Sequence, residues 1–262
     1  MVNTVSMSEM SKDDYQRRVV DQGGVVLLPV GAVEQHGYHL PLGTDWLLSD
    51  YMAREAAVRL NGVVAPPIMY ASRSQIRTGG GPHQCGTVSL DGQTLIGLVK
   101  EVIKELARHG AQKIAVIDSH FENRFFLDES CYQAIRELKL AGIDNVKIVK
   151  MQFAEGLTDE TRAKAYEGIP FAGRHLEHGG FYETALMLHA YPHLVTMASI
   201  PEEDLPQFPP YDVFPEQPDW VPESGNLSSG KLATAARGKL MMDEMLEALV
   251  DALRQEFPDI SP

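Results

Sequence analysis

Val25-Val-Leu-Leu-Pro-Val30 leads directly into Gly31-Ala-Val-Glu-Gln-His-Gly-Tyr-His-Leu-Pro-Leu-Gly-Thr-Asp45. The first run is short, apolar and rich in β-branched residues, and a glycine closes it, so it predicts a buried strand. Glu34, His36 and Asp45 follow in the second run. In open α/β sheets, ligand sites lie outside the carboxyl ends of strands. Oxygen and imidazole ligands together suit zinc or manganese, although a polar loop with a chance histidine is the alternative.

The composition is that of an ordinary globular protein. The chain has 262 residues, 44% of them hydrophobic, and we expect a single domain over residues 1–262. A net charge of −13 argues against nucleic acid and anionic membranes as partners. Cys85 and Cys131 lie far apart, so a disulfide framework is not expected. The N-terminus does not resemble a signal peptide, and no apolar run reaches the ~20 residues of a membrane helix. These features predict a soluble, cytoplasmic protein.

Strands and helices alternate along the chain. The apolar patterns predict strands at Val25–Val30, Val63–Ala65, Ile114–Ile117 and Val146–Met151. They predict helices at Ser8–Val20, Asp45–Leu60 (capped by Thr44 or Asp45), Asp91–His109, Asn123–Leu140, Phe181–Ala190 and Lys231–Glu256. This alternation is typical of a layered α/β fold with a mainly parallel sheet.

Two segments are predicted to be irregular. Ser72–His83 contains three consecutive glycines, which allow close approach of the backbone to a ligand, but it lacks the ending of a phosphate-binding P-loop. Residues 201–230 form a long proline-rich, acidic segment. We expect this segment to pack on the protein through aromatic residues, namely Phe208, Tyr211, Phe214 and Trp220.

A second predicted strand also ends in ligand-type residues, His120 and Glu122. Five mixed ligands can hold two divalent ions if one carboxylate bridges them, and Asp45 is the natural bridge because it has no partner two residues away. Two such ions can hold a bridging hydroxide and polarise a carbonyl, which makes hydrolysis the natural reaction. His178, at the start of a predicted helix, can protonate the leaving nitrogen as a general acid. Glu177 beside it is expected to be structural.

These motifs together resemble the creatininase (creatinine amidohydrolase) family. The resemblance runs over nearly the whole chain and rests on Leu28–Gly37, Asp45, Gly79–His83, Gly86–Asp91, His120–Asn123, Glu177–Thr184 and Phe208–Pro215. It implies a three-layer α/β/α fold, two zinc or manganese ions, a cytoplasmic homohexamer and opening of a small cyclic amide. It implies one metal held by Glu34, Asp45 and His120 and another held by His36, Asp45 and Glu122. It further implies that His178 and Glu122 are catalytic.

The residues that would contact the substrate depart from the creatinine enzyme. Its two pocket tryptophans correspond to Ala154 and Arg174, and Thr78, Phe121 and His175 also replace its residues. With His178, these positions would bind the substrate. Because Arg174 can pair with a carboxylate, we expect a small amide or cyclic amide that bears an anionic group.

Three functions therefore stay open. The first is a creatininase-like amidohydrolase, and the second is a formamide deformylase or small-lactone hydrolase on the same metal site. The third is a non-catalytic hexameric binding protein, which the complete ligand set disfavours.

Overall fold

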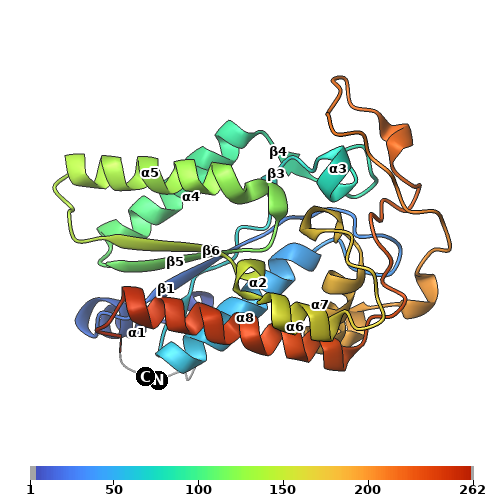
Figure 1. Ribbon diagram of the computed structural model, residues 1–262. Helices are drawn as coiled ribbons and strands as arrows, with labels where there is room; N and C mark the ends of the chain where they lie inside the picture. Colours follow the sequence, from blue (N-terminus) through green and yellow to red (C-terminus); the bar gives the residue numbers. More distant parts are fainter. Residues whose placement is uncertain (1–3, 261–262) are drawn as a thin grey trace.

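A four-stranded parallel sheet forms the centre of the protein, in a computed structural model that describes residues 4–260. The strand order is β2-β1-β5-β6 (Figure 1). The strands are β1 (Val26–Val30), β2 (Val63–Val64), β5 (Lys113–Asp118) and β6 (Lys147–Gln152). β1 and β5 are neighbours, and Val30 lies opposite Asp118. The two segments that follow these strands therefore leave the sheet side by side.

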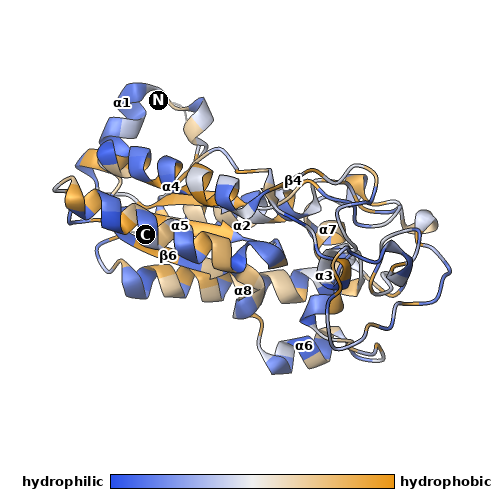
Figure 2. Ribbon diagram, turned by 90° about the horizontal axis from the view of Figure 1, so that it is seen from above, coloured by the Kyte–Doolittle hydropathy of each residue, from blue (hydrophilic) through white to orange (hydrophobic). Residues whose placement is uncertain are grey.

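Helices cover both faces of the sheet (Figure 1). α4 (Gly92–Arg108) and α5 (Arg124–Leu140) lie on one face, and α2 (Thr44–Leu60), α7 (Phe181–Ala190) and α8 (Ala235–Glu256) lie on the other. Side chains of β1 alternate between them, since Leu27 packs with α2 and α8 whereas Val26 and Leu28 pack with α4 and α5. Figure 2 shows apolar strands beneath helices that are apolar only in part. The expected three-layer α/β/α fold is confirmed.

Five helix starts differ from those expected from sequence, and those of α4 and α5 differ by a single residue. The first helix is α1 (Lys12–Tyr15), continued as a π-helix over Gln16–Asp21, because Ser11 rather than Ser8 caps it. α8 begins four residues later than expected, where the side chain of Thr234 accepts a hydrogen bond from Arg237 N. α2 begins at Thr44, so Asp45 is its second residue and not its cap. The carboxylate of Asp45 is therefore free for the site.

Several short helices and strands were not predicted, because they contain too few residues to show a hydrophobic period. They are α3 (Ile76–Gly79) within the glycine-rich segment, α6 (Asp159–Ala165), and the parallel pair β3 (Ala71–Ser72) and β4 (Ser89–Leu90).

The proline-rich segment has little regular structure, as expected. Two of its aromatic residues, Phe208 and Trp220, pack against a small apolar cluster, whereas Tyr211 and Phe214 are exposed. Across residues 4–260, every helix is too short or too polar to span a bilayer.

Candidate active site and metal centre

Four ligand-type side chains meet beyond the carboxyl ends of β1 and β5. Glu34 and His36 follow β1, Asp45 lies in the first turn of α2, and His120 follows β5. All four are at most 3% exposed. Burying charged groups costs free energy unless they are paired or bind a metal, so we expect these side chains to form ion pairs or to bind a metal ion.

The first group is Glu34, Asp45 and His120. His120 Nδ1 lies 3.2 Å from Glu34 Oε1 and 3.2 Å from Asp45 Oδ2. Its Nε2 lies 3.1 Å from the carbonyl oxygen of Ser72, which can only accept, so Nε2 carries a proton and donates it. Burial alone would lower the pKa of His120, but the carboxylates of Glu34 and Glu122 raise it well above its usual value. A metal that binds at Nδ1 would displace the second ring proton.

The second group is His36, Asp45 and Glu183. His36 Nε2 lies 3.4 Å from Asp45 Oδ1 and 3.7 Å from Glu183 Oε2. Its Nδ1 lies 3.1 Å from the carbonyl oxygen of Glu34, so Nδ1 donates there and Nε2 points at the carboxylates. Asp45 thus belongs to both groups, as expected for a bridging carboxylate.

The second group differs from the set that the sequence suggested. Glu183, in the first turn of α7, stands where Glu122 was expected. Glu122 Oε2 lies 3.5 Å from Nε2 of His120, on the ring edge opposite Asp45. Its Oε1 accepts hydrogen bonds from Gln75 N, at 3.2 Å, and from Thr78 Oγ1. Glu122 therefore lies beside the centre and belongs to none of the three-residue ligand groups among residues 4–260.

Two buried atoms show that these side chains fit a metal. Glu34 Oε2 and His36 Nε2 have no hydrogen-bond partner among the described residues. An unsatisfied buried polar atom costs about 1–3 kcal/mol, and a divalent cation would satisfy both. Carboxylate oxygens with imidazole nitrogens are the donors that zinc and manganese accept.

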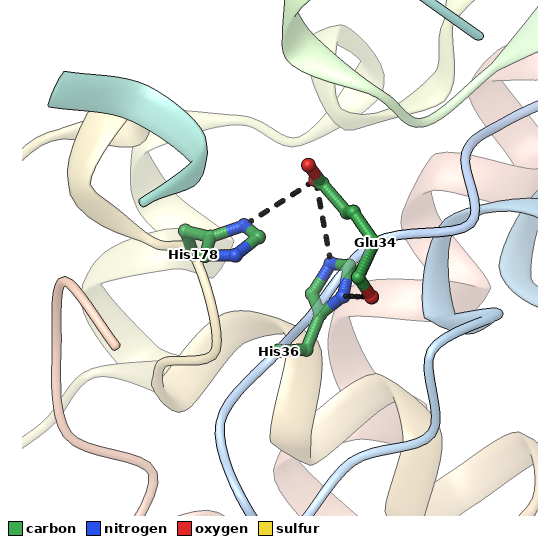
Figure 3. Close-up of side chains that lie close together, drawn as sticks. All are labelled: Glu34, His36 and His178. Carbon is green, nitrogen blue, oxygen red and sulfur yellow. Dashed lines mark hydrogen bonds and ion pairs between the residues drawn. The ribbon is translucent and has the colours of Figure 1, made fainter. Parts of the chain in front are cut away.

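His178 forms a third group of possible ligands with Glu34 and His36 (Figure 3). Its Nδ1 lies 3.6 Å from Glu34 Oε1, and its ring centroid lies 4.3 Å from that of His36. Nε2 lies 2.6 Å from the carbonyl oxygen of Gln35 and 2.9 Å from the side-chain nitrogen of the same residue. Both protons of that nitrogen are donated to the carbonyl oxygens of Gly79 and Gly225, so Nε2 of His178 donates to the Gln35 carbonyl and Nδ1 keeps a free lone pair. Burial, and then the charge on His36, hold the pKa of His178 well below its usual value. The ring is therefore neutral at neutral pH.

A cavity of about 140 Å³ opens above the cluster. Of the residues expected to contact a substrate, His175 does not line it, whereas the others do, namely Thr78, Phe121, Ala154, Arg174 and His178. Residues that sequence reasoning did not single out also line it, including Arg124, Arg162, Tyr166 and Tyr182.

Comparisons with known proteins identify the family. The family described as creatininase, creatinine amidohydrolase, matches residues 8–253. Creatinine amidohydrolase of Pseudomonas putida is 40% identical over 258 residues, which cover 98% of this chain and 99% of that protein. This chain belongs to the creatininase family. A more distant relative, the mycofactocin precursor peptide peptidase of Mycobacterium ulcerans, is 27% identical and covers 89% of this chain and 86% of that protein.

Solved creatininase structures share the fold and contain metals. A manganese creatininase superposes with a TM-score of 0.94 at 40% identity, covering 98% of this chain and 100% of that one. A mutant creatininase of a zinc–zinc type superposes with a TM-score of 0.94 at 39% identity, with the same coverage of both chains. Together with the clustered ligands, these relatives make this creatininase family member a metal-dependent hydrolase of carbon–nitrogen bonds. Its cofactors are divalent zinc or manganese, as expected from the sequence.

Proposed function

We propose that this protein hydrolyses a small cyclic amide that carries an anionic group. The observation that carries the proposal is one cavity whose lining includes Arg174, His178 and most of the proposed ligands, namely Glu34, Asp45, His120 and Glu183. Glu34, Asp45 and His120 would hold one divalent ion, and His36, Asp45 and Glu183 would hold the other. Bound there, the ions would polarise the amide carbonyl and lower the pKa of water to about 7.

His178 is suited to move the proton. Because Nε2–H is held by the carbonyl of Gln35, the lone pair of Nδ1 faces Glu34 and the cluster. Nδ1 can accept a proton from the attacking water and deliver it to the nitrogen that leaves. An amide nitrogen is a poor leaving group until it is protonated, so this transfer matters more for amides than for esters.

Arg174 is the feature that favours an anionic substrate. Three arginines line the cavity, but Arg124 pairs with Glu155 at 3.2 Å and Arg162 pairs with Asp159 at 2.5 Å. The guanidinium of Arg174 is exposed and has no ion pair or hydrogen bond with the described residues. A guanidinium binds a carboxylate through two parallel hydrogen bonds, so Arg174 is the available site for one.

The test uses amide pairs that differ by one carboxylate. Hydantoin would be compared with hydantoin-5-acetate and 2-pyrrolidinone with 5-oxoproline, and creatinine would be included. We expect the carboxylates to be preferred, and Arg174→Ala to lower kcat/KM for them about 10–100-fold, as a charged hydrogen bond of 1.5–3 kcal/mol implies. Neutral substrates should be unaffected. Arg124→Ala, which removes a paired arginine from the same wall, is the matched control. Efficient turnover of creatinine, with no effect of Arg174→Ala on any substrate, would refute the anionic substrate.

The same assay with other substrates distinguishes the alternative functions. Formamides and small lactones should be cleaved poorly if the substrate is a cyclic amide. A non-catalytic binding protein would turn over no amide, and near-zero zinc and manganese after purification without chelator would favour it.

We also propose that the chain forms one domain over residues 1–262 and a cytoplasmic homohexamer without nucleic-acid or membrane partners. The family resemblance supports the hexamer, and the net charge of −13 supports the excluded partners. Light scattering should then give the mass of six chains of 29.0 kDa.

A further inference from the structure

A closed ring of buried hydrogen bonds connects the imidazole of His120 to its own backbone. His120 Nε2 donates to the carbonyl oxygen of Ser72 at 3.1 Å. The amide N and the hydroxyl of Ser72 donate to Asn123 Oδ1 at 3.1 and 2.9 Å. Asn123 Nδ2 donates to Asp118 Oδ1 at 2.8 Å, and the same oxygen accepts from the backbone N of His120 at 3.2 Å. Each member is at most 2% exposed.

The directions of these bonds leave Asn123 one orientation. Its oxygen faces two donors from Ser72, and its NH₂ faces the carboxylate of Asp118, so flipping the amide would place donors against donors. Gln152 Nε2 strengthens the ring from β6, because it donates to Asp118 Oδ2 at 2.9 Å and to the carbonyl oxygen of His120 at 3.0 Å.

The ring of hydrogen bonds contacts only one of the two proposed metal sites. It fixes the proton of His120 on Nε2 and presents Nδ1 to Glu34 and Asp45. His36 is set differently, since its Nδ1 meets the carbonyl oxygen of Glu34, two residues away. Loss of the ring should therefore disturb the His120 group and leave the His36 group in place.

We infer that Asn123 is a positioning residue that, through Ser72, makes Nδ1 of His120 the metal-binding nitrogen of one site. The inference rests on the proposed metal ligands. A histidine ligand is oriented by the group that accepts its other N–H, and losing such a partner costs about 10–100-fold in metal affinity. Here the accepting carbonyl is itself held by Asn123, which has no hydrogen bond to a proposed ligand atom and is not among the residues that line the cavity.

The experiment counts metals in Asn123→Ala and Asn123→Ser. Metal-free protein would be titrated with zinc under a competing chelator, and bound zinc measured by mass spectrometry. Wild type should bind two equivalents tightly, whereas each variant should keep one and bind the other about 10–100-fold more weakly. Ser130→Ala is the control, because Ser130 is fully buried in the adjoining helix α5 and, among residues 4–260, its hydroxyl bonds only the carbonyl oxygen of Phe126.

Two tight equivalents in both variants, or equal weakening of both sites, would overturn the inference. Fewer than two equivalents in wild type would instead refute the two-metal proposal. A measurement on the unmutated enzyme decides the matter if the variants do not fold. In protein loaded with ¹¹³Cd and labelled with ¹⁵N, we expect coupling to Nδ1 of His120 and a retained proton on Nε2. Coupling to Nε2 would overturn the inference.

Discussion

Replacing Glu183 by glutamine should have opposite effects on the metal-free and the metal-loaded protein. Glu183 is one of the carboxylates that face His36, and it accepts a hydrogen bond from Gly179 N at 2.7 Å. Glutamine is isosteric and can still accept that hydrogen bond through its amide oxygen. The substitution therefore removes the charge and a metal ligand with little change in packing.

The size of the effect on the stability of the metal-free protein follows from the pKa of the Glu183 carboxyl group. Burial raises the pKa of Glu183 from 4.5 to about 8, so the folded protein binds its proton more tightly than the unfolded chain does. The resulting cost is absent below pH 4.5, grows as the pH rises and becomes constant above about pH 8. At pH 7, about 2.5 pH units above 4.5, the raised pKa lowers the free energy of unfolding by roughly 3 kcal/mol, at about 1.36 kcal/mol for each unit.

Glutamine does not carry this cost, so metal-free Glu183→Gln should be more stable than wild type at pH 7. At about 2–4 °C per kcal/mol, its Tm should rise by on the order of 5–10 °C. The two proteins should converge at pH 4.5. With metal at about 1,000 times its Kd the order should reverse, because wild type gains about 4.1 kcal/mol for each site and the variant loses that gain at one site, which exceeds the roughly 3 kcal/mol by which the metal-free variant is ahead.

The assay is thermal unfolding with and without zinc, at pH 4.5 and pH 7, together with metal analysis. Glu122→Gln is the comparison, since the family resemblance implied Glu122 for the second site, whereas Glu183 is the carboxylate that lies within ligand distance of His36 and Asp45. If Glu183→Gln binds two metals while Glu122→Gln binds one, the structural assignment is refuted. A metal-free Glu183→Gln that is less stable than wild type at pH 7 would refute the electrostatic argument.

Other substitutions test the rest of the molecule. His178→Gln should lower kcat for a cyclic amide about 10²–10⁴-fold and lower it less for a lactone, and an equal loss would exclude proton delivery to nitrogen. Gly238→Ala should destabilise the protein by several kcal/mol, because a Cβ there would lie 1.9 Å from the carbonyl oxygen of Ala185, and unchanged denaturant unfolding would contradict that contact. Thr234→Ala should cost about 1 kcal/mol by the same measurement, since it removes the cap bond from Arg237 N.

Much of the site could be predicted because its ligands lie at strand ends. The apolar run of β1 and that of β5 are unmistakable in sequence, and parallel pairing places their carboxyl ends together. Glu34, His36 and His120 then meet without any further information. Asp45 joins them because α2 starts directly behind the first loop.

Glu183 could not be found in this way, because a helix far along the chain supplies it. Its approach depends on close contacts that no local pattern encodes. A Cβ on Gly179 would lie 2.4 Å from Asn226 Oδ1, and one on Gly180 would lie 1.7 Å from Ser228 Oγ. These two glycines let the start of α7 reach the cluster. An acidic residue in the first turn after a His-Gly-Gly sequence is the one signal that pointed to it.

The residue proposed to select the substrate and the residue proposed to move the proton lie on one short segment. Arg174 is exposed in the cavity wall, yet four residues later His178 is 5% exposed and held by the backbone of Gln35. A substitution at the exposed end changes what the cavity binds and leaves no buried group unpaired, so it costs little stability. A substitution at the buried end would leave a buried polar group without its hydrogen-bond partner beside the two proposed metal sites. If Arg174 binds the substrate and His178 moves the proton, as proposed, this arrangement would allow the substrate to change at the exposed end while the proton transfer is retained.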